Sequence, residues 1–380
     1  MAIQVFQATF DVEACLAEIR ECLEKGWTGM GFKTVQMEEA WKKYTGFENA
    51  YYLNSSTAGL NLCIEILKEK YGWADGDEII TTPLTFISTN HAILLGGMHP
   101  VFADVDDTFC MDPKEAEKKI TEKTRAIMYV GLGGNVGHWD EIVTLAKKYN
   151  LKLILDAAHM AGTRINGVIP GREADVVVYS YQAVKNLPTA DSGMICFREK
   201  ELDAVARKRA WLGINKDTYA RTGSGGNYKW KYDVEYVGRK DHGNSVIASL
   251  ALVQLRHLDE DNARRREICE QYQEGLAVLG DKIRFANVLY PEECSRHLFQ
   301  ILIERRDELM TYLNEHDIFP GVHYVDNTEY RMYRYAHGTC PHAAYISDHT
   351  MTLPLHMRLT DEDVQTVIRE VVHFFETCVH

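Results

Sequence analysis

Short apolar runs alternate with longer amphipathic segments along most of the chain. Three such runs lie at residues 151–155, 176–179 and 194–197. Each is rich in β-branched residues and is bounded by polar or glycine-containing segments, which is typical of buried β-strands. Further short runs predict strands at 51–53, 78–81, 100–105, 125–130 and 298–303. Because helical segments separate many of these strands, the pattern favours an α/β fold with a largely parallel sheet.

Apolar residues recur with a helical period in several of the intervening segments. Three such apolar stripes are the clearest. They consist of Val12, Leu16, Ile19 and Leu23 near the N-terminus; of Leu60, Cys63, Ile64, Leu67 and Tyr71 after the strand at 51–53; and of Val364, Val367, Ile368 and Val371 near the C-terminus. We expect Thr360 to cap the last helix, because Asp363 follows three residues later. Further segments predict helices at 139–150, 246–255 and 307–316, and a separate charged helix that follows residues 256–259 and runs through 271.

Composition limits the class of protein. The chain has 380 residues and is 46% hydrophobic, which is enough for a large domain, predicted at 1–255, and a smaller C-terminal α+β domain, predicted at 256–380. Its 42 basic and 55 acidic residues give a net charge of −13, which disfavours nucleic acid as a partner. The N-terminus lacks a secretion signal pattern and no apolar stretch could span a bilayer, so we expect a cytoplasmic protein without a membrane partner.

Several common site types are disfavoured by spacing. The nine cysteines are scattered without a C-x-x-C pair, which argues against a zinc ribbon or a disulfide framework and favours buried thiols. The histidines between 316 and 356 fall in no ligand spacing, so no metal site is predicted. The glycines at 131–134 do not complete G-x-G-x-x-G, because Val136 takes the last position; this disfavours a nicotinamide-dependent oxidoreductase. The Gly-rich stretch 223–227 is typical of a loop.

Reactive side chains follow two of the predicted strands. Asp156 and His159 follow the strand at 151–155, and Ser180 and Lys185 follow the strand at 176–179. Ligands of open α/β sheets collect at strand ends. Taken singly, such a lysine is usually solvated and such an aspartate usually caps a helix. The combination suits pyridoxal 5′-phosphate (PLP), which needs an amine for a Schiff base, an anion near its pyridine nitrogen and donors for its phosphate.

The same segment resembles the DegT-type sugar aminotransferases, which are fold-type I PLP-dependent enzymes. That family has D-A-A-[QH]-x-x-G, then G-x-x-A-D, then S-[FY]-x-x-x-K, and this chain matches them at 156–162, 171–175 and 180–185. The resemblance implies a large domain with a mostly parallel sheet flanked by helices. It also implies roles in cofactor binding: Lys185 as the Schiff-base lysine, Asp156 as the pyridinium partner, His159 near the ring and Ser180 on the phosphate.

Three further segments extend the resemblance around the cofactor. The turn 54–59 matches the family's phosphate-binding segment, which makes Ser56, Thr57 and Ala58 candidates, although a small polar turn also serves as a plain N-cap. Phe86 stands where the family places a side chain over the cofactor ring. Lys240 lies in a segment that, in the family, reaches across a dimer interface to the neighbour's cofactor phosphate. A homodimer with active sites at the interface is therefore implied, while a merely solvated Lys240 remains open.

Substrate contacts are less sharply indicated. The segment 26–31 resembles the family's G-x-W-[TL]-x-G, which implies Thr28 and Gly29, and 318–324 resembles G-I-x-x-x-x-H-Y, which implies His323 and Tyr324 at the mouth of the site. The chain departs from the family at Gly131, where a histidine is common, and at 190–193, where G-E-G-G is usual. Both departures leave the substrate open.

The function implied by the resemblance is amino transfer, with glutamate as the expected donor and the keto group of a nucleotide-linked sugar as the acceptor, in amino-sugar or polysaccharide biosynthesis. A small phosphorylated ketone or a keto-cyclitol is the alternative acceptor. A binding or regulatory protein with the same fold and cofactor is a hypothesis of another class. The presence of Lys185 disfavours that reading, and also the sugar-deoxygenating relatives that carry histidine there.

Overall fold

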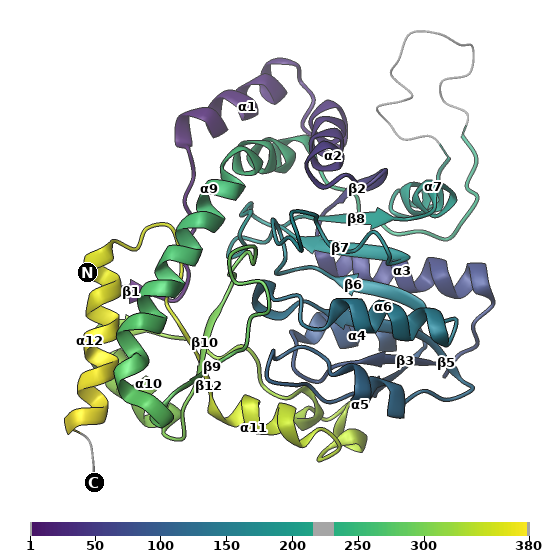
Figure 1. Ribbon diagram of the computed structural model, residues 1–380. Helices are drawn as coiled ribbons and strands as arrows, with labels where there is room; N and C mark the ends of the chain where they lie inside the picture. The colour runs from purple at the N-terminus through teal and green to yellow at the C-terminus, as the bar shows by residue number, and fades with distance from the viewer. Residues whose placement is uncertain (1, 216–231, 378–380) are drawn as a thin grey trace.

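The computed structural model describes residues 2–215 and 232–377; the Gly-rich stretch 223–227, expected as a loop, lies outside these residues. A seven-stranded sheet forms the centre of the larger part of the molecule (Figure 1). Only β8 runs against its neighbours, so the sheet is mixed but mostly parallel, and the predicted α/β class is confirmed. In spatial order the strands are β2 (Asn49–Leu53), β8 (Gly193–Phe197), β7 (Val176–Ser180), β6 (Lys152–Asp156), β5 (Thr124–Val130), β3 (Glu78–Thr81) and β4 (His99–Phe102).

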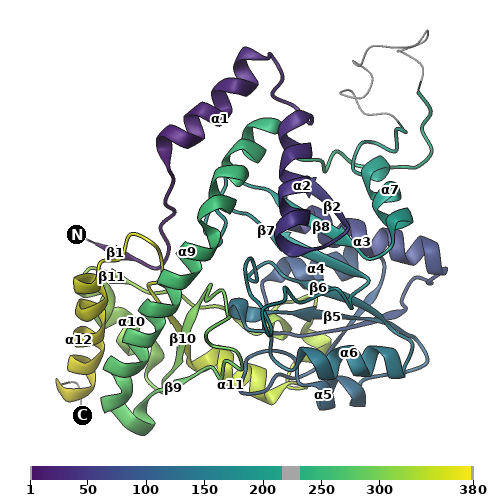
Figure 2. The same ribbon diagram turned by 45° about the horizontal axis from the view of Figure 1, so that its top comes forward.

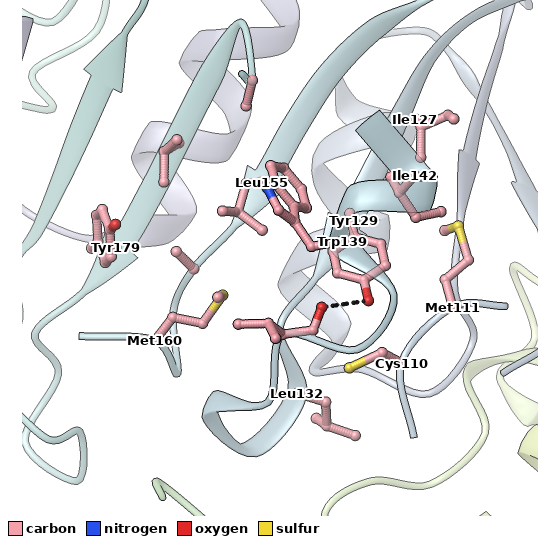
Figure 3. Close-up of a cluster of buried hydrophobic side chains, with 14 of the residues drawn as sticks. Cys110, Met111, Ile127, Tyr129, Leu132, Trp139, Ile142, Leu155, Met160 and Tyr179 are labelled. Atoms are coloured by element: carbon pink, nitrogen blue, oxygen red, sulfur yellow. Dashed lines mark hydrogen bonds between the residues drawn. The ribbon is translucent and has the colours of Figure 1, made fainter. Parts of the chain in front are cut away.

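Helices cover both faces of this sheet, which explains why its strands read as continuous apolar runs. Leu153 and Leu155 of β6 point to one face, and Ile154 points to the other. One face packs against α2 (Phe32–Thr45), α5 (Pro113–Lys118) and α6 (Trp139–Lys148), and the other against α3 (Ser56–Tyr71), α4 (Ile87–Leu95) and α7 (Lys200–Arg209). Figure 3 shows the first core, in which the Tyr129 hydroxyl donates to the Val136 carbonyl at 2.9 Å.

A second core lies in the C-terminal part of the chain. Its antiparallel sheet has the order β12 (Thr350–Leu353), β10 (Phe299–Leu302) and β9 (Arg284–Phe285). The helices α10 (Arg306–Glu315) and α12 (Asp361–Thr377) pack on this core, and α11 (Pro341–His349) lies beside it. The N-terminal strand β1 (Ile3–Gln4) pairs with β11 (Ile318–Phe319), so the start of the chain lies against this part (Figure 2).

The long helix α9 (Ser245–Leu276) joins the two parts, as Figure 1 shows. Its N-cap is Asn244, whose side chain accepts from the Ile247 backbone N–H at 2.9 Å. Residues near its start pack in the core of the large sheet, and Ile268 and Tyr272 near its end pack in the second core. The expected interruption between two helices at 256–259 is wrong, because α9 runs through these residues without a break. The domain division at 255/256 falls inside this helix, and we retain it as a proposal.

The helical stripes have two different outcomes. The stripe of α12 is buried as expected, and Thr360 and Asp363 form the predicted reciprocal cap, with Asp363 N–H donating to Thr360 Oγ1 at 3.1 Å. The segment 12–23 is also helical, as α1 (Val12–Glu24). However, α1 packs on α9 through Cys15 and Cys22, so its apolar stripe faces away from the protein: the exposed fractions are 60% for Val12, 50% for Leu16 and 62% for Leu23.

The sequence also led us to expect buried free cysteines, no membrane-spanning segment and no metal site. All eight cysteines in the described part of the chain are free and buried, which agrees with thiols used as small apolar side chains. None of the helices described has the length and apolar character that crossing a membrane requires. Over the same residues, no group of three histidine, cysteine or acidic side chains is placed to hold a metal ion.

Candidate active site

A cavity of about 380 Å³ opens where the large sheet meets the segments around 85–89 and 323–324. Two of its walls are strand ends, since Asp156 is the last residue of β6 and Ser180 is the last residue of β7. This is the edge at which open α/β sheets bind ligands. Nine of the residues predicted from the sequence line the cavity: Ser56, Thr57, Phe86, Asp156, His159, Ser180, Lys185, His323 and Tyr324.

Asp156 is a buried carboxylate with two hydrogen bonds. Its Oδ2 accepts from the Thr89 hydroxyl at 2.7 Å, and its Oδ1 accepts from the Ala158 backbone N–H at 3.1 Å. Burial raises the pKa of Asp156 above its ordinary value, although these hydrogen bonds and the charge of Lys185 oppose the rise. A cationic group in the cavity would therefore stabilise the ionised form of Asp156. The ionised carboxylate would in turn keep a pyridine nitrogen protonated.

Lys185 supplies an amine to the same cavity. Burial lowers its pKa from 10.5 to about 8, even though the Asp156 carboxylate acts to raise it. Near neutral pH a much larger fraction of the amine is therefore neutral than in a solvated lysine, and the neutral amine is the form that attacks a carbonyl carbon. Within the described residues the Lys185 amine forms no hydrogen bond, so the group is not tied to a structural partner.

The loop that carries Lys185 is held by the residue after it. The Asn186 amide donates to Asn262 Oδ1 at 2.8 Å and to the Ser295 carbonyl at 2.6 Å. The loop closes through a hydrogen bond from Tyr181 N–H to the Ser192 carbonyl at 2.9 Å. It then enters β8 at Gly193, where a Cβ would lie 2.7 Å from the Ser56 nitrogen. The altered sequence at 190–193 therefore keeps the one glycine that the close contact with α3 needs.

The N-terminus of α3 forms another wall of the cavity. Ser55 is the N-cap, and its hydroxyl accepts from the Ala58 backbone N–H at 3.1 Å. The N–H groups of Ser56 and Thr57 have no acceptor within the helix, because the first turn of any helix lacks them. Together with the positive end of the helix dipole they can bind an anion such as a phosphate. Ala58 is buried and does not line the cavity.

His159 and Tyr324 meet at one side of the cavity. The His159 Nδ1 accepts from the Gly133 backbone N–H at 3.1 Å, and its Nε2 lies 3.2 Å from the Tyr324 hydroxyl. Burial and the charge of Lys185 hold the pKa of His159 well below its usual range. The His297 ring packs against His159 with 4.3 Å between centroids. Tyr324 also contacts Phe86, with 5.8 Å between ring centroids.

Three other predicted residues do not line the cavity. Lys240 is exposed; its amine lies 5.8 Å from the centre of the Trp211 ring, and its carbonyl accepts from the Asn54 side chain at 3.2 Å. Thr28 and Gly29 are also exposed, and their carbonyls accept from the Ser245 backbone N–H at the start of α9. The assigned roles of these residues stay predictions, as do the roles of the residues inside the cavity.

Sequence reasoning missed several residues of the wall. Thr89 is the most important, because its hydroxyl holds the Asp156 carboxylate and itself meets the Thr85 hydroxyl at 3.0 Å. The two threonines are four residues apart, with Thr85 just before α4 and Thr89 in its first turn. This spacing is the signal that could have indicated a buried polar pair. Other cavity residues that were not singled out from the sequence are Ser55, Ser88, Gln182, Asp191 and Ser192.

The departure at Gly131 is compensated inside the protein. Gly131 does not line the cavity. A Cβ at this position would lie 2.0 Å from the Met160 Sδ, so the Met160 side chain fills the space that a larger residue would occupy. Replacing a histidine by glycine here therefore does not widen the cavity.

The residues present fit PLP. A buried carboxylate can hold the ring nitrogen, a lysine with a lowered pKa can bond to the aldehyde carbon, and the first turn of α3 can bind the phosphate. All three groups face one cavity, and its volume of about 380 Å³ is within the usual range for small-molecule sites.

Comparisons with known proteins agree with this chemistry. The family model of the DegT/DnrJ/EryC1/StrS aminotransferases matches residues 10–372. The spore coat polysaccharide biosynthesis protein SpsC of Bacillus subtilis (strain 168) is 33% identical, over 94% of this chain and 93% of its own.

Two solved structures are similar over the full length of both chains. The aminotransferase TlmJ from Streptoalloteichus hindustanus superposes with a TM-score of 0.90 at 32% identity. Spr1654 from Streptococcus pneumoniae, assigned as a sugar aminotransferase and solved in its PLP form, superposes with a TM-score of 0.88 at 27% identity.

Proposed function

We propose a function for this chain on one premise: it belongs to the DegT/DnrJ/EryC1/StrS aminotransferase family and is a PLP-dependent aminotransferase. We infer that it moves an amino group from glutamate to the keto group of a nucleotide-linked sugar. The observation that carries the catalytic part is that Lys185 and Asp156 line the same cavity. The choice of a sugar acceptor is supported by the polysaccharide pathway in the name of SpsC and by the assignment of Spr1654.

Lys185 and Asp156 have complementary roles in this reaction. When bound, PLP supplies an aldehyde that carries the amino group between the two substrates and a ring that withdraws electrons from the reacting carbon. The neutral Lys185 amine takes the proton from the α-carbon of the donor, and in the second half-reaction it returns a proton to the former keto carbon. The Asp156 carboxylate, held by Thr89 and Ala158, keeps the ring nitrogen protonated.

We infer that the other residues of the cavity bind the cofactor and orient it. Ser56 and Thr57 offer backbone N–H groups to the phosphate, and Ser180 adds a hydroxyl nearby. Phe86 and His159 border the space that the ring would take. Because His159 is neutral, it contributes hydrogen bonds to this part of the site without adding a charge that would oppose the ring nitrogen.

We also propose that the protein acts as a homodimer in which Lys240 serves the partner's site. Two observations support this. Lys240 is exposed and outside its own chain's cavity, and the apolar stripe of Val12, Leu16 and Leu23 on α1 faces away from its own core. A second copy that covers such a stripe would remove apolar surface from water.

The dimer is tested by light scattering after gel filtration. We expect a dimeric mass for the wild-type protein and a shift toward monomer for Leu16→Glu, while Glu13→Gln on the same helix serves as a control. A monomeric wild-type protein would refute the dimer. For Lys240→Ala, we expect weaker binding of PLP with an unchanged dimeric mass; unchanged PLP affinity would remove Lys240 from the site.

The acceptor is tested with a substrate panel. The purified enzyme is given glutamate and either nucleotide-linked keto sugars or small phosphorylated ketones, and the formation of 2-oxoglutarate is measured. We expect turnover with at least one nucleotide-linked keto sugar and none with Lys185→Ala. Turnover restricted to the small ketones would refute the sugar acceptor, and turnover by Lys185→Ala would refute the catalytic lysine.

A further inference from the structure

The hydrogen bond between Gly133 and His159 determines the direction of the hydrogen bond between His159 and Tyr324. The His159 Nδ1 lies 3.1 Å from the Gly133 backbone nitrogen. A backbone N–H can only donate, so the Nδ1 must carry a lone pair and no proton. Gly133 thereby fixes which of the two imidazole nitrogens is protonated in neutral His159.

Burial and nearby positively charged groups keep His159 neutral at physiological pH. The ring is buried, the Lys185 amine and His323 face it from separate segments, and the His297 ring packs against it at 4.3 Å between centroids. The Asp156 carboxylate lines the same cavity but forms no hydrogen bond with His159 within the described residues. Neutral His159 therefore carries its single proton on Nε2.

That proton faces the Tyr324 hydroxyl, 3.2 Å from His159 Nε2. Since the Nε2–H donates, the phenol oxygen accepts, and the proton of the hydroxyl must point elsewhere. Across residues 2–215 and 232–377, this contact with His159 is the one hydrogen bond recorded for that hydroxyl. Tyr324 lines the cavity beside Lys185 and Asp156, so its free proton is available to a ligand there.

We propose that Tyr324 is a further catalytic residue, which donates its hydroxyl proton as a hydrogen bond to the reacting oxygen of the keto substrate, while His159 and Gly133 fix its direction. The keto oxygen gains negative charge as nitrogen adds to its carbon. A positioned donor stabilises that charge more than it stabilises the ground state. Burial raises the pKa of Tyr324 well above its usual range, so the hydroxyl keeps its proton over the whole working range of pH.

The inference rests on the proposed amino transfer, but its first test does not require activity. In the cofactor-free wild-type protein labelled with ¹⁵N-histidine, long-range ¹H–¹⁵N spectra report which ring nitrogen of each neutral histidine carries the proton. The His159 signals are identified by their absence from His159→Asn. We expect a protonated Nε2 and a bare Nδ1. The opposite tautomer, or a charged ring at neutral pH, would overturn the proposal whatever the substrate is.

The second test removes only the hydroxyl. Tyr324→Phe keeps the ring that contacts Phe86, and Tyr345→Phe is the matched control, because the Tyr345 hydroxyl donates to Glu304 at the surface, at 2.9 Å. With any ketone that the wild-type enzyme accepts, we expect Tyr324→Phe to lower kcat on the order of 100-fold, with little change in KM or in bound PLP.

The two tests separate the possible failures. A kcat of Tyr324→Phe equal to that of Tyr345→Phe would overturn the role of the hydroxyl. A loss of PLP or of the folded state in Tyr324→Phe would assign the hydroxyl to structure and also overturn the proposal. If no sugar is aminated by the wild-type enzyme, the sugar acceptor fails, while both tests of Tyr324 still apply to the ketones that react.

Discussion

The lowered pKa of Lys185 predicts how the cofactor-free protein captures PLP. Only the neutral amine attacks the aldehyde, so the rate of capture should follow the neutral fraction. With a pKa of about 8, about 10% of the amine is neutral at pH 7 and about 90% at pH 9. At the ordinary lysine pKa of 10.5, only about 0.03% would be neutral at pH 7. The protein therefore holds roughly 300 times more reactive amine at pH 7 than a solvated lysine would.

The structure also predicts in which direction the pKa of Lys185 changes when Asp156 loses its charge. The negative charge of Asp156 raises the Lys185 pKa, against the larger effect of burial. Removing that charge in Asp156→Asn should therefore lower the Lys185 pKa further and move the midpoint of capture to a lower pH. The variant should be faster than the wild-type protein below pH 8 in this first step, even though PLP is then held less tightly.

The assay is stopped-flow absorbance of the cofactor-free protein mixed with excess PLP from pH 6 to 10. Free Nα-acetyl-lysine, measured in parallel, corrects for the ionisations of PLP itself. We expect a half-maximal rate near pH 8 for the wild-type protein. A midpoint near 10.5, or a midpoint that rises in Asp156→Asn, would refute the reasoning about burial and charge.

Two further variants test the shell around the site. Thr89→Val removes the hydroxyl that donates to Asp156 at 2.7 Å. Because a hydrogen bond to a charged group contributes about 1.5–3 kcal/mol, we expect this variant to bind PLP at least about tenfold more weakly in a fluorescence titration, and Thr89→Ser to bind it nearly as the wild-type protein does. Equal affinities of Thr89→Val and the wild-type protein would contradict the account. Gly131→Ala places a Cβ 2.0 Å from the Met160 Sδ, so we expect a loss of about 1–3 kcal/mol and a lower thermal midpoint. Gly29→Ala, where no atom lies within 4 Å of the added Cβ, should leave the midpoint unchanged, and a wild-type midpoint for Gly131→Ala would disprove the tight packing.

Much of the fold could be predicted because its signals are local. The apolar runs of the large sheet are buried on both faces, so each reads as a strand without knowledge of its partners. Asp156 and Lys185 could be placed together because each follows such a strand and parallel strands bring their ends to one edge. The cap of α12 was visible in the three-residue spacing of Thr360 and Asp363.

The rest depends on contacts between distant segments. The stripe on α1 predicted a helix but not its orientation, because a pattern does not say whether a core or a second molecule covers it. Gly131 looked like a change in the substrate site until the structure placed Met160 in the vacated space. The Gly133 amide that fixes the His159 tautomer lies 26 residues away in sequence, and no local pattern links the two.

The central claim is that Lys185 is the amine that bonds to PLP. The most direct measurement is borohydride reduction of the PLP-loaded protein, followed by protease digestion and mass spectrometry of the peptides. The account predicts that the reduced cofactor is attached to Lys185, and that Lys185→Arg carries none. A cofactor attached to another lysine, or a wild-type protein that binds PLP without any reducible bond, would contradict it.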